Sequence, residues 1–590
     1  MDGGAAYWVR SDPADRGRTT LWRCDPPGAP EDLTPDWDVR TTLHAYGGTA
    51  VGLHQGRACF ADRVTRRVWV RESDGSARPV TPAGTWVWGG FVFRDADHVV
   101  CLREDHSAPG GPRDALVELD MTSDNATAGR VIAEGADFYF SPAAGPGGWL
   151  AWMEYDHPSM PWGSTRIVAL APDGTRHLVA GSPGVSAVHP QWDADSSLVF
   201  LSDESGYWTF HRWQGGRVSR LHDHPYDFCG PQWVASGPPY ALVDGGIGCT
   251  WWQDGWPHLG VLRPDGGLDD WGTYGAATVG PATGGVGVGV LSTPEREPGV
   301  YRIDWTTRAV TPLSVPEPVL SPDRIARPRR LAWGDDGATG WYYPPSPPPG
   351  VVPPPGPAPL VVMAHGGPTA HAEPGFSRVV QFLATRGIGV LDVNYTGSSG
   401  AGRAYREALN GAWGVADVRD CVAGAGHLVD QHLADPARLA IMGGSAGGYT
   451  VLRALTTTTA FSAGISLYGI GDMEALEAET DKFESRYTQT LVAPYPAGRA
   501  TYIERSPIHH VDQLGSPLLL LQGADDPVVA PNQAERMYEA VRARGLEAEL
   551  VVYPGESHGF RQAGTIEDCY RRILAFLARV WGFAADPDAR

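Results

Sequence analysis

Two patterns of hydrophobic and polar residues divide the chain near residue 315. Before that point, short apolar segments of β type are separated by Gly, Pro, Asp and Asn, without helical periodicity. Beyond it, apolar segments of four or five residues alternate with amphipathic segments of helical period. We therefore expect two domains, residues 1–315 and residues 316–590, with the boundary near Val315–Pro318.

A strand and turn recur seven times in the first part. The apolar strand begins at residues 21, 68, 116, 167, 210, 259 and 300, at intervals of 41 to 51 residues. Some repeats continue into hairpin dipeptides such as Asp74-Gly75 and Asp265-Gly266. Because this interval matches one four-stranded blade, the pattern predicts a seven-bladed β-propeller, with most of the 22 tryptophans packed between its strands.

The second part has the pattern of a sheet covered by helices. The predicted strands are 360–363, 389–393, 438–442, 518–521 and 549–553, and the clearest helical segments are 533–544 and 566–581. Apolar strands that alternate with helices indicate an α/β domain with a doubly wound, mostly parallel sheet. The Pro-rich stretch 344–359 is either an interdomain linker or a surface loop within this domain.

Charge and composition exclude several classes of protein. The chain has 47 basic and 68 acidic residues, a net charge of −21, which argues against binding nucleic acid or anionic lipid. We find no run of eighteen apolar residues and no signal-peptide pattern after Met1, so we expect no membrane span and no secretion. The seven cysteines include no C-x-x-C pair and are predicted to be buried free thiols in a cytoplasmic protein.

Gly443–Gly447 fits the pattern G-x-S-x-G. The motif follows a predicted buried strand and precedes a helical segment that begins at Ala446, which is the context of a nucleophile elbow. Its glycines allow a tight, strained turn that lifts the serine hydroxyl above the sheet. We therefore predict Ser445 as a nucleophile, and a Gly-rich structural turn is the alternative.

A serine nucleophile needs a base and a residue that orients the base. In this fold class the chain order is Ser, Asp, His, each at the carboxyl end of a strand. His558 follows the last predicted strand and is the expected base; a capped loop histidine is the alternative. Asp525 and Asp526 both follow the preceding strand, and either could orient His558.

An oxyanion intermediate needs hydrogen-bond donors. The backbone N–H of Ala446 comes directly after the nucleophile, and the second donor should come from the loop after an earlier strand. Gly367, in the loop after strand 360–363, is the predicted second donor. We expect His365 to make a structural hydrogen bond.

No cofactor or metal motif accompanies these residues. The glycine-rich stretch 284–289 lacks the Lys-Ser/Thr pair and the following helix of a phosphate loop. His222–His224 and His509–His510 have no further ligands at a metal-binding spacing. The sequence therefore predicts neither a cofactor nor a metal.

Segments over nearly the whole chain resemble the prolyl oligopeptidase family of serine peptidases, in which a propeller is joined to an α/β-hydrolase domain. The matching segments are Tyr46–Gly48, Asp156–Trp162, His365–Pro368, Asn394–Gly400, Trp413–Gly414 with Asp417, and Lys482–Tyr487. The chain is most similar to the bacterial acylaminoacyl-peptidase and aminopeptidase branch, and to actinomycete aminopeptidases, including the kind that hydrolyses the amide of puromycin. The spacing from Asp526 to His558 is also similar to that branch and favours Asp526.

The resemblance implies cleavage of short peptides or aminoacyl amides near a free N-terminus, through an acyl-enzyme. It also implies that the propeller caps the site and excludes folded proteins. An aminopeptidase must bind an ammonium group, which requires a carboxylate near the nucleophile. Glu484 is the first candidate, followed by Glu154 and Asp156. Alternatively, Glu484 pairs with Arg486 or with an arginine of the propeller.

Two departures from the branch concern substrate recognition. Ala45 stands where the branch usually has Glu before Tyr-Gly-Gly, and the chain begins later than is usual. Three alternatives to an aminopeptidase therefore stay open: an acylaminoacyl peptidase, a hydrolase of a non-peptide amide or ester such as an antibiotic or biosynthetic intermediate, and a non-catalytic interaction protein. An oligomer is compatible with the sequence.

Overall fold

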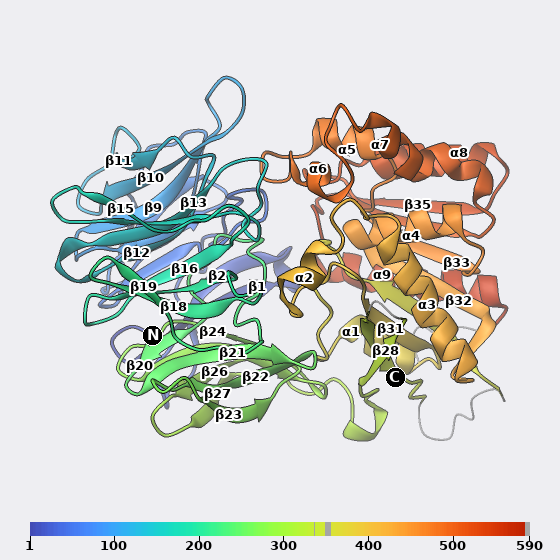
Figure 1. Cartoon of the computed structure of the whole chain (residues 1–590), viewed down its shortest axis with the longest axis horizontal. Coiled ribbons are helices and arrows are strands. Elements are labelled where there is room, and N and C mark those ends of the chain that lie inside the picture. The colour runs from blue at the N-terminus through green and yellow to red at the C-terminus, as the bar shows by residue number, and fades with distance from the viewer. Residues whose placement is uncertain (335–336, 348–355, 584–590) are drawn as a thin grey trace. The chain divides into compact units, whose positions relative to one another are not determined.

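Seven separate sheets form the first unit of the computed structural model, which describes residues 1–334, 337–347 and 356–583 (Figure 1). Six sheets have four strands that are consecutive in the chain, and the first sheet has three. This arrangement confirms the predicted seven-bladed β-propeller.

The strands of the seven sheets are, in chain order, β1 (Ala6–Asp12), β2 (Arg18–Cys24), β3 (Glu31–Asp32); β4 (Val51–His54), β5 (Arg57–Asp62), β6 (Arg67–Arg71), β7 (Ala77–Pro79); β8 (Trp86–Phe93), β9 (His98–Asp105), β10 (Arg113–Asp120), β11 (Arg130–Glu134); β12 (Phe138–Ala144), β13 (Leu150–Tyr155), β14 (Arg166–Leu170), β15 (Arg176–Ala180); β16 (Ala187–Trp192), β17 (Leu198–Ser202), β18 (Thr209–Gln214), β19 (Arg217–Arg220); β20 (Ala241–Val243), β21 (Gly246–Gln253), β22 (Trp256–Leu262), β23 (Leu268–Thr273); and β24 (Ala276–Val279), β25 (Val286–Thr293), β26 (Arg296–Asp304), β27 (Ala309–Ser314).

The seven recurring strands of the sequence occupy equivalent positions in these sheets. In each four-stranded sheet the recurring strand is the third, for example β6 or β10, whereas in the first sheet it is the second, β2. Among the described residues, the first sheet therefore has no counterpart of the first strand of the others. Large aromatic side chains fill the interior, and Trp88, Trp152, Trp208 and Trp251 are fully buried, as the sequence predicts for most tryptophans.

One eight-stranded sheet forms the centre of the second unit. Its order is β28-β29-β31-β30-β32-β33-β34-β35; β28 and β29 are antiparallel to their neighbours, and the rest are parallel. The strands are β28 (Arg329–Trp333), β29 (Ala338–Tyr343), β30 (Ala358–Ala364), β31 (Gly389–Asn394), β32 (Ala434–Gly444), β33 (Ala463–Leu467), β34 (Leu518–Gly523) and β35 (Ala548–Tyr553). The mostly parallel sheet confirms the predicted class, and β28, β29 and β33 are strands that the sequence analysis missed.

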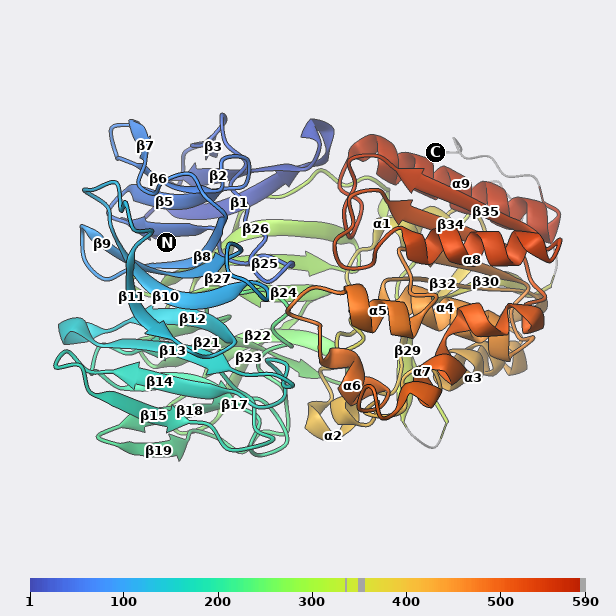
Figure 2. The same cartoon turned by 90° about the horizontal axis from the view of Figure 1, so that it is seen from above.

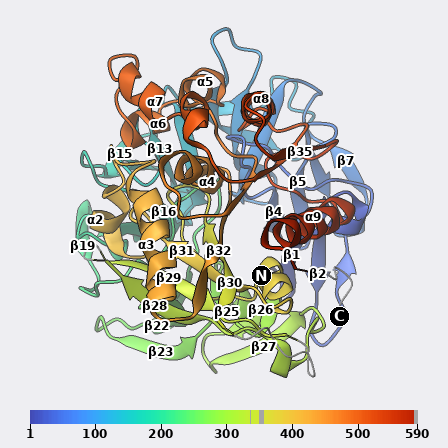
Figure 3. The same cartoon turned by 90° about the vertical axis from the view of Figure 1, so that its right-hand side faces the viewer.

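Helices cover both faces of this sheet. They are α1 (Arg378–Ala384), α2 (Gly402–Glu407), α3 (Ala416–Asp430), α4 (Ala446–Thr457), α5 (Met473–Glu479), α6 (Tyr487–Leu491), α7 (Arg499–Arg505), α8 (Asn532–Ala543) and α9 (Ala563–Trp581); the 3-10 turns are η1 (Pro13–Asp15), η2 (Pro146–Gly148), η3 (Pro322–Arg324) and η4 (Pro507–Gln513). Helices α1 and α9 lie on one face, and α3, α4 and α8 lie on the other (Figure 2). The strands are seen between α9 and α3 in Figure 3.

The two units are not divided by a single point in the sequence. The first comprises Met1–Asp12, Arg18–Leu291 and Pro298–Val315, and the second comprises Pro13–Gly17, Ser292–Glu297 and Pro316–Arg590. The segments 13–17 and 292–297 thus belong to the second unit although they precede residue 315. The Pro-rich stretch connects β29 and β30 of one sheet, and its residues 348–355 lie outside the described residues.

The described residues include no helix that is long and apolar enough to cross a membrane. All seven cysteines are buried free thiols.

Two glycines of α3 allow a matched test of how tightly this helix packs on the sheet. A Cβ on buried Gly424 would lie 2.7 Å from the ring of Trp333, whose Nε1 is fixed by a 2.9 Å hydrogen bond to Asp420 O, whereas a Cβ on exposed Gly426 would meet nothing within 4 Å. Gly424→Ala should lower the free energy of unfolding by about 1–3 kcal/mol. Gly426→Ala should raise it by about 0.5–1 kcal/mol. Denaturant unfolding should show that the free energy of unfolding changes in opposite directions in the two variants. Equal changes would contradict the close packing of Gly424 against Trp333.

Candidate active site

The serine of the G-x-S-x-G motif lies between β32 and α4. Ser445 has φ 55° and ψ −121°, a strained conformation for a residue with a side chain. The turn is tight against the neighbouring strand β30: a Cβ on Gly447 would lie 2.0 Å from Ala364 O, and one on Gly443 would lie 2.7 Å from the same oxygen. Only glycine fits at these two positions, as the sequence pattern of an elbow requires.

A chain of hydrogen bonds joins the three residues singled out by their order in the sequence. Ser445 Oγ lies 2.9 Å from His558 Nε2, and His558 Nδ1 lies 2.8 Å from Asp526 Oδ2. The serine hydroxyl can thus donate to Nε2 while Nδ1–H donates to the carboxylate. Ser445 follows β32, Asp526 follows β34 and His558 follows β35, so three parallel strands deliver these side chains to one edge of the sheet.

The structure distinguishes the two neighbouring aspartates. Asp526 is buried, and its Oδ1 accepts backbone N–H groups of Val528 at 2.9 Å and Val529 at 3.0 Å, which leaves Oδ2 for His558. Gln522 Nε2 lies 3.4 Å from the same Oδ2. Asp525 is exposed, and its backbone N–H donates to Glu556 O. Asp526, rather than Asp525, is therefore in place to orient the imidazole.

The two expected oxyanion donors directly follow β30 and β32. At these two strands the chain stops adding strands on one side of the sheet and begins to add them on the other. Strands β30 and β32 are neighbours, and Gly367 follows the first while Ala446 follows the second. A Cβ on Gly366 would lie 3.7 Å from Ser445 Cβ, so the loop after β30 passes directly beside the serine. Gly367, Ser445 and Ala446 border one small cavity. The N–H of Ala446 lies at the N-terminus of α4, which favours negative charge.

His365, in the same loop, has a structural role. Its Nε2 lies 2.7 Å from Ser398 Oγ, and its ring stacks on Tyr395 with centroids 4.2 Å apart. Burial lowers the pKa of His365 to about 4, so the ring is neutral near pH 7. A neutral, fully engaged imidazole is suited to hold the loop and not to carry a proton.

Four apolar side chains make up half of the rest of the cavity wall. They are Trp413, Ile470, Leu476 and Val529. Trp413 is buried and packs on Tyr449 of α4 with ring centroids 4.7 Å apart. The wall suits an uncharged substrate side chain next to the bond that Ser445 would attack. The sequence analysis did not identify these residues, although Trp413 stands in one of the matching motifs.

Glu484 borders the same cavity as Ser445. It lies between α5 and α6, is half-buried, and its backbone carbonyl accepts the N–H of Tyr487 at 2.8 Å. Tyr487 also faces the cavity, where its hydroxyl lies 3.2 Å from the N–H of Thr369. Burial raises the pKa of the Tyr487 phenol, and the negative charge of Glu484 raises it further. The cavity wall therefore combines apolar side chains with three hydroxyl-bearing ones, Thr480, Tyr487 and Thr488, and has one carboxylate at its border.

The other two candidate carboxylates lie in the first unit and are engaged in ion pairs. Asp156 Oδ2 lies 2.7 Å from Arg166 Nη2, and Glu154 Oε1 lies 3.4 Å from Arg166 Nε. Glu154 Oε2 also accepts Trp152 Nε1 at 2.8 Å and pairs with Arg176 at 3.3 Å. These contacts give both carboxylates a structural role within the first unit.

Comparisons with known proteins show which proteins this chain is similar to. The model of the prolyl oligopeptidase family matches residues 374–583. Dipeptidyl aminopeptidase BIII of Pseudoxanthomonas mexicana is 34% identical over 237 residues, which cover 39% of this chain and 34% of that protein. The chain thus aligns with only about a third of the length of the first curated relatives.

Solved structures match over almost the whole chain. A Mycobacterium tuberculosis puromycin-hydrolyzing peptidase has a TM-score of 0.94 and 36% identity, covering 99% of this chain and 94% of that chain. A puromycin hydrolase has a TM-score of 0.93 and 33% identity, with the same coverage. This chain belongs to the prolyl oligopeptidase family.

Proposed function

We propose that this protein is a serine exopeptidase that hydrolyses short peptides or aminoacyl amides, and that it acts as an aminopeptidase. The observation that carries the proposal is the hydrogen-bonded series Ser445–His558–Asp526 beside a cavity that a carboxylate borders. The names of the related proteins, a dipeptidyl aminopeptidase and two puromycin-hydrolysing enzymes, support the same activity.

In this mechanism Ser445 Oγ attacks the carbonyl carbon of the N-terminal residue while His558 Nε2 accepts the hydroxyl proton. The backbone N–H groups of Ala446 and Gly367 bind the oxyanion of the tetrahedral intermediate. His558 then donates its proton to the leaving amine, and an acyl-enzyme on Ser445 results. Water, deprotonated by His558, hydrolyses the ester and releases the N-terminal residue. Asp526 holds Nδ1–H throughout and stabilises the imidazolium.

We assign Glu484 to the substrate's ammonium group. In an aminopeptidase this group lies one carbon from the scissile carbonyl, so its partner must border the same cavity as Ser445, and Glu484 does. A charge-assisted hydrogen bond of this kind is worth about 1.5–3 kcal/mol. The apolar wall would then receive the side chain of the same residue.

The test is a matched pair of arylamides, alanine 4-nitroanilide and its N-acetyl derivative. The wild-type enzyme should prefer the free amine, and Glu484→Gln should lower kcat/KM for it by about 10- to 100-fold while the acetylated substrate is unaffected. Glu474→Gln is the matched control, because Glu474 lies on the adjacent α5 and pairs with Arg499 at 2.6 Å.

Two outcomes would contradict this assignment. If both substrates lose activity equally in Glu484→Gln, the carboxylate has a structural role. If the wild-type enzyme prefers the acetylated substrate, the protein is an acylaminoacyl peptidase or a general acyl hydrolase, for which the relatives named acylamino-acid-releasing enzymes provide the precedent.

We also propose that the protein works in the cytoplasm. Its seven cysteines are all free and buried, which is typical of proteins kept in a reducing compartment. Fractionation of the source cells, followed by immunodetection, would test the proposal.

A further inference from the structure

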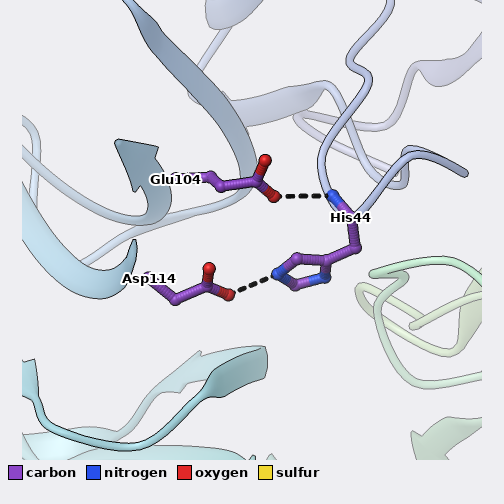
Figure 4. A group of neighbouring side chains, drawn as sticks. All are labelled: His44, Glu104 and Asp114. Carbon is purple, nitrogen blue, oxygen red and sulfur yellow. Dashed lines mark hydrogen bonds and ion pairs between the residues drawn. The ribbon is translucent and has the colours of Figure 1, made fainter. Parts of the chain in front are cut away.

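Side-chain contacts join distant segments of the chain in each unit. In the first unit, His44 Nε2 lies 2.5 Å from Asp114 Oδ2, and the backbone N–H of His44 donates to Glu104 Oε2 at 2.8 Å (Figure 4). His106 also pairs with Glu104, so each carboxylate has a histidine partner, and these contacts hold β9 and β10 to the loop that carries His44. In the second unit, a row of aromatic side chains leads instead to the predicted base, His558.

The rings of this row contact one another in sequence. The centroid of the Tyr468 ring lies 4.9 Å from that of the His558 ring, with an angle of 61° between the two planes. Phe560 meets Tyr468 at 5.3 Å and 90°, and Tyr553 meets Phe560 at 5.0 Å. The far end is fixed, because the Tyr553 hydroxyl donates to Asp568 of α9 at 2.9 Å. The imidazole of His558 is thus the last ring of a packed series.

An unusual backbone conformation places Tyr468 in this row. Tyr468 directly follows β33 and has φ 39°, which is uncommon for a bulky residue. Its N–H donates to Leu521 O of β34 at 2.7 Å, and the N–H of Ser445 donates to Leu467 O at 2.9 Å. Tyr468 is therefore held between the strand that precedes the nucleophile and the strand that precedes Asp526. Backbone strain of this kind clusters at functional sites, which points to a role for this side chain.

The nucleophile elbow leaves room for the Tyr468 ring. A Cβ on Gly444, the residue before Ser445, would lie 2.9 Å from Cε2 of Tyr468 and 3.0 Å from its hydroxyl oxygen. Gly444 does not have a positive φ, so glycine is required here by the space that the ring fills and not by the backbone conformation. Tyr468 thus lies against both the elbow and the base.

We propose that Tyr468 is a positioning residue, which holds the imidazole of His558 in line between Asp526 and Ser445. The proposal rests on the proposed function, because it takes His558 as the base. Hydrogen bonds of 2.8 Å and 2.9 Å place the two ring nitrogens. The ring of Tyr468 adds a contact to the imidazole itself, so the imidazole cannot tilt into the space that Tyr468 fills. Within the described part of the chain, Tyr468 is not among the residues that border the cavity, so it acts through His558.

The ring of Tyr468, and not its hydroxyl, has this role. Burial raises the pKa of the Tyr468 phenol to about 12, and the negative charge of Asp526 contributes to the same shift. The hydroxyl therefore stays protonated and does not act as an acid or a base near neutral pH. Phenylalanine keeps the ring and should replace Tyr468 without loss of turnover.

The first test compares three variants on alanine 4-nitroanilide. Tyr468→Leu keeps an apolar side chain but removes the ring, and it should lower kcat by about 10- to 100-fold while KM stays unchanged. Tyr468→Phe should keep the kcat of the wild type. Tyr538→Leu is the matched control, because Tyr538 is half-buried on α8 and is not among the described residues that border the cavity. Its kcat should also equal that of the wild type.

Two further measurements distinguish positioning from a merely structural role. The proton on His558 Nδ1 should give a low-field NMR resonance in the wild type and in Tyr468→Phe, because it is held by Asp526. In folded Tyr468→Leu this resonance should broaden, since the imidazole is less well fixed. Gly444→Ala should lower kcat in the wild type by displacing the ring, but it should have little further effect in Tyr468→Leu.

Several results would overturn the proposal. They are a wild-type kcat in Tyr468→Leu, a change in KM alone, or an unaltered low-field resonance. An equal loss of kcat in Tyr468→Phe would assign the effect to the hydroxyl instead. If Tyr468→Leu does not fold, Gly444→Ala still tests the contact, and an unchanged kcat there would contradict it. Failure of the proposed function gives a different result, because the wild type would then cleave neither arylamide, while the resonance would still report how Tyr468 holds His558.

Discussion

Ser445→Ala should lower kcat by about six orders of magnitude, the size of effect seen when a triad serine is removed from a serine peptidase. The loss is large because His558 and Asp526 act only through the hydroxyl that lies 2.9 Å from His558 Nε2. Hydrolysis of the free-amine arylamide and labelling by a fluorophosphonate probe would both measure it.

The control for this variant is Ser516→Ala. The hydroxyl of Ser516 donates to Phe461 O at 2.6 Å and does not border the cavity, so its loss should leave kcat unchanged. Near wild-type turnover or labelling in Ser445→Ala would exclude Ser445 as the nucleophile, and unlabelled wild-type protein would point to a non-catalytic role.

Asp526→Asn should lower kcat by about 10⁴-fold. The loss is expected because the two carboxylate oxygens of Asp526 have different hydrogen-bond partners. Oδ1 accepts the N–H groups of Val528 and Val529, so an asparagine would place its carbonyl oxygen there and turn its NH₂ group toward His558. His558 Nδ1 would then have to accept a hydrogen bond, which puts the proton on Nε2 and prevents it from accepting the proton of Ser445.

Asp525→Asn is the matched control for this prediction. It makes the same chemical change one residue earlier, on an exposed side chain, and kcat should stay within the error of the wild type. The kcat values of Asp525→Asn and Asp526→Asn should therefore differ by nearly the whole factor of about 10⁴. A large loss in Asp525→Asn together with an active Asp526→Asn would reverse the assignment of the orienting residue.

The fold could be predicted where its signal is local and repeated. The seven recurring strands and the long amphipathic segment of α9 gave such signals. Strand β28 did not, because four of its five residues are exposed or half-buried and its apolar run is only three residues long. Strand β33 is five residues long and contains Gly464 and Ser466, so its apolar pattern is too weak to separate it from a loop.

The sequence predicts some residues of the candidate site individually, narrows others to two alternatives, and does not identify the rest. Parallel strands end at one edge, so chain order alone places Ser445, an aspartate and His558 together. The choice between Asp525 and Asp526 depends on which carboxylate meets the N–H groups of Val528 and Val529, and that is a property of the folded loop. The residues of the cavity wall could not be predicted from the sequence, because Trp413, Ile470 and Val529 come from three separate segments.

Every propeller sheet is made from strands that follow one another directly in the chain. Within the part of the chain that the structure describes, no strand is exchanged between sheets, and the first sheet is not completed by a strand from the last. Each backbone hydrogen-bond ladder is thus encoded by one uninterrupted stretch of gene. A duplication or deletion of that length could add or remove a whole sheet while every other ladder stays intact, so the architecture can change in evolution by whole repeats.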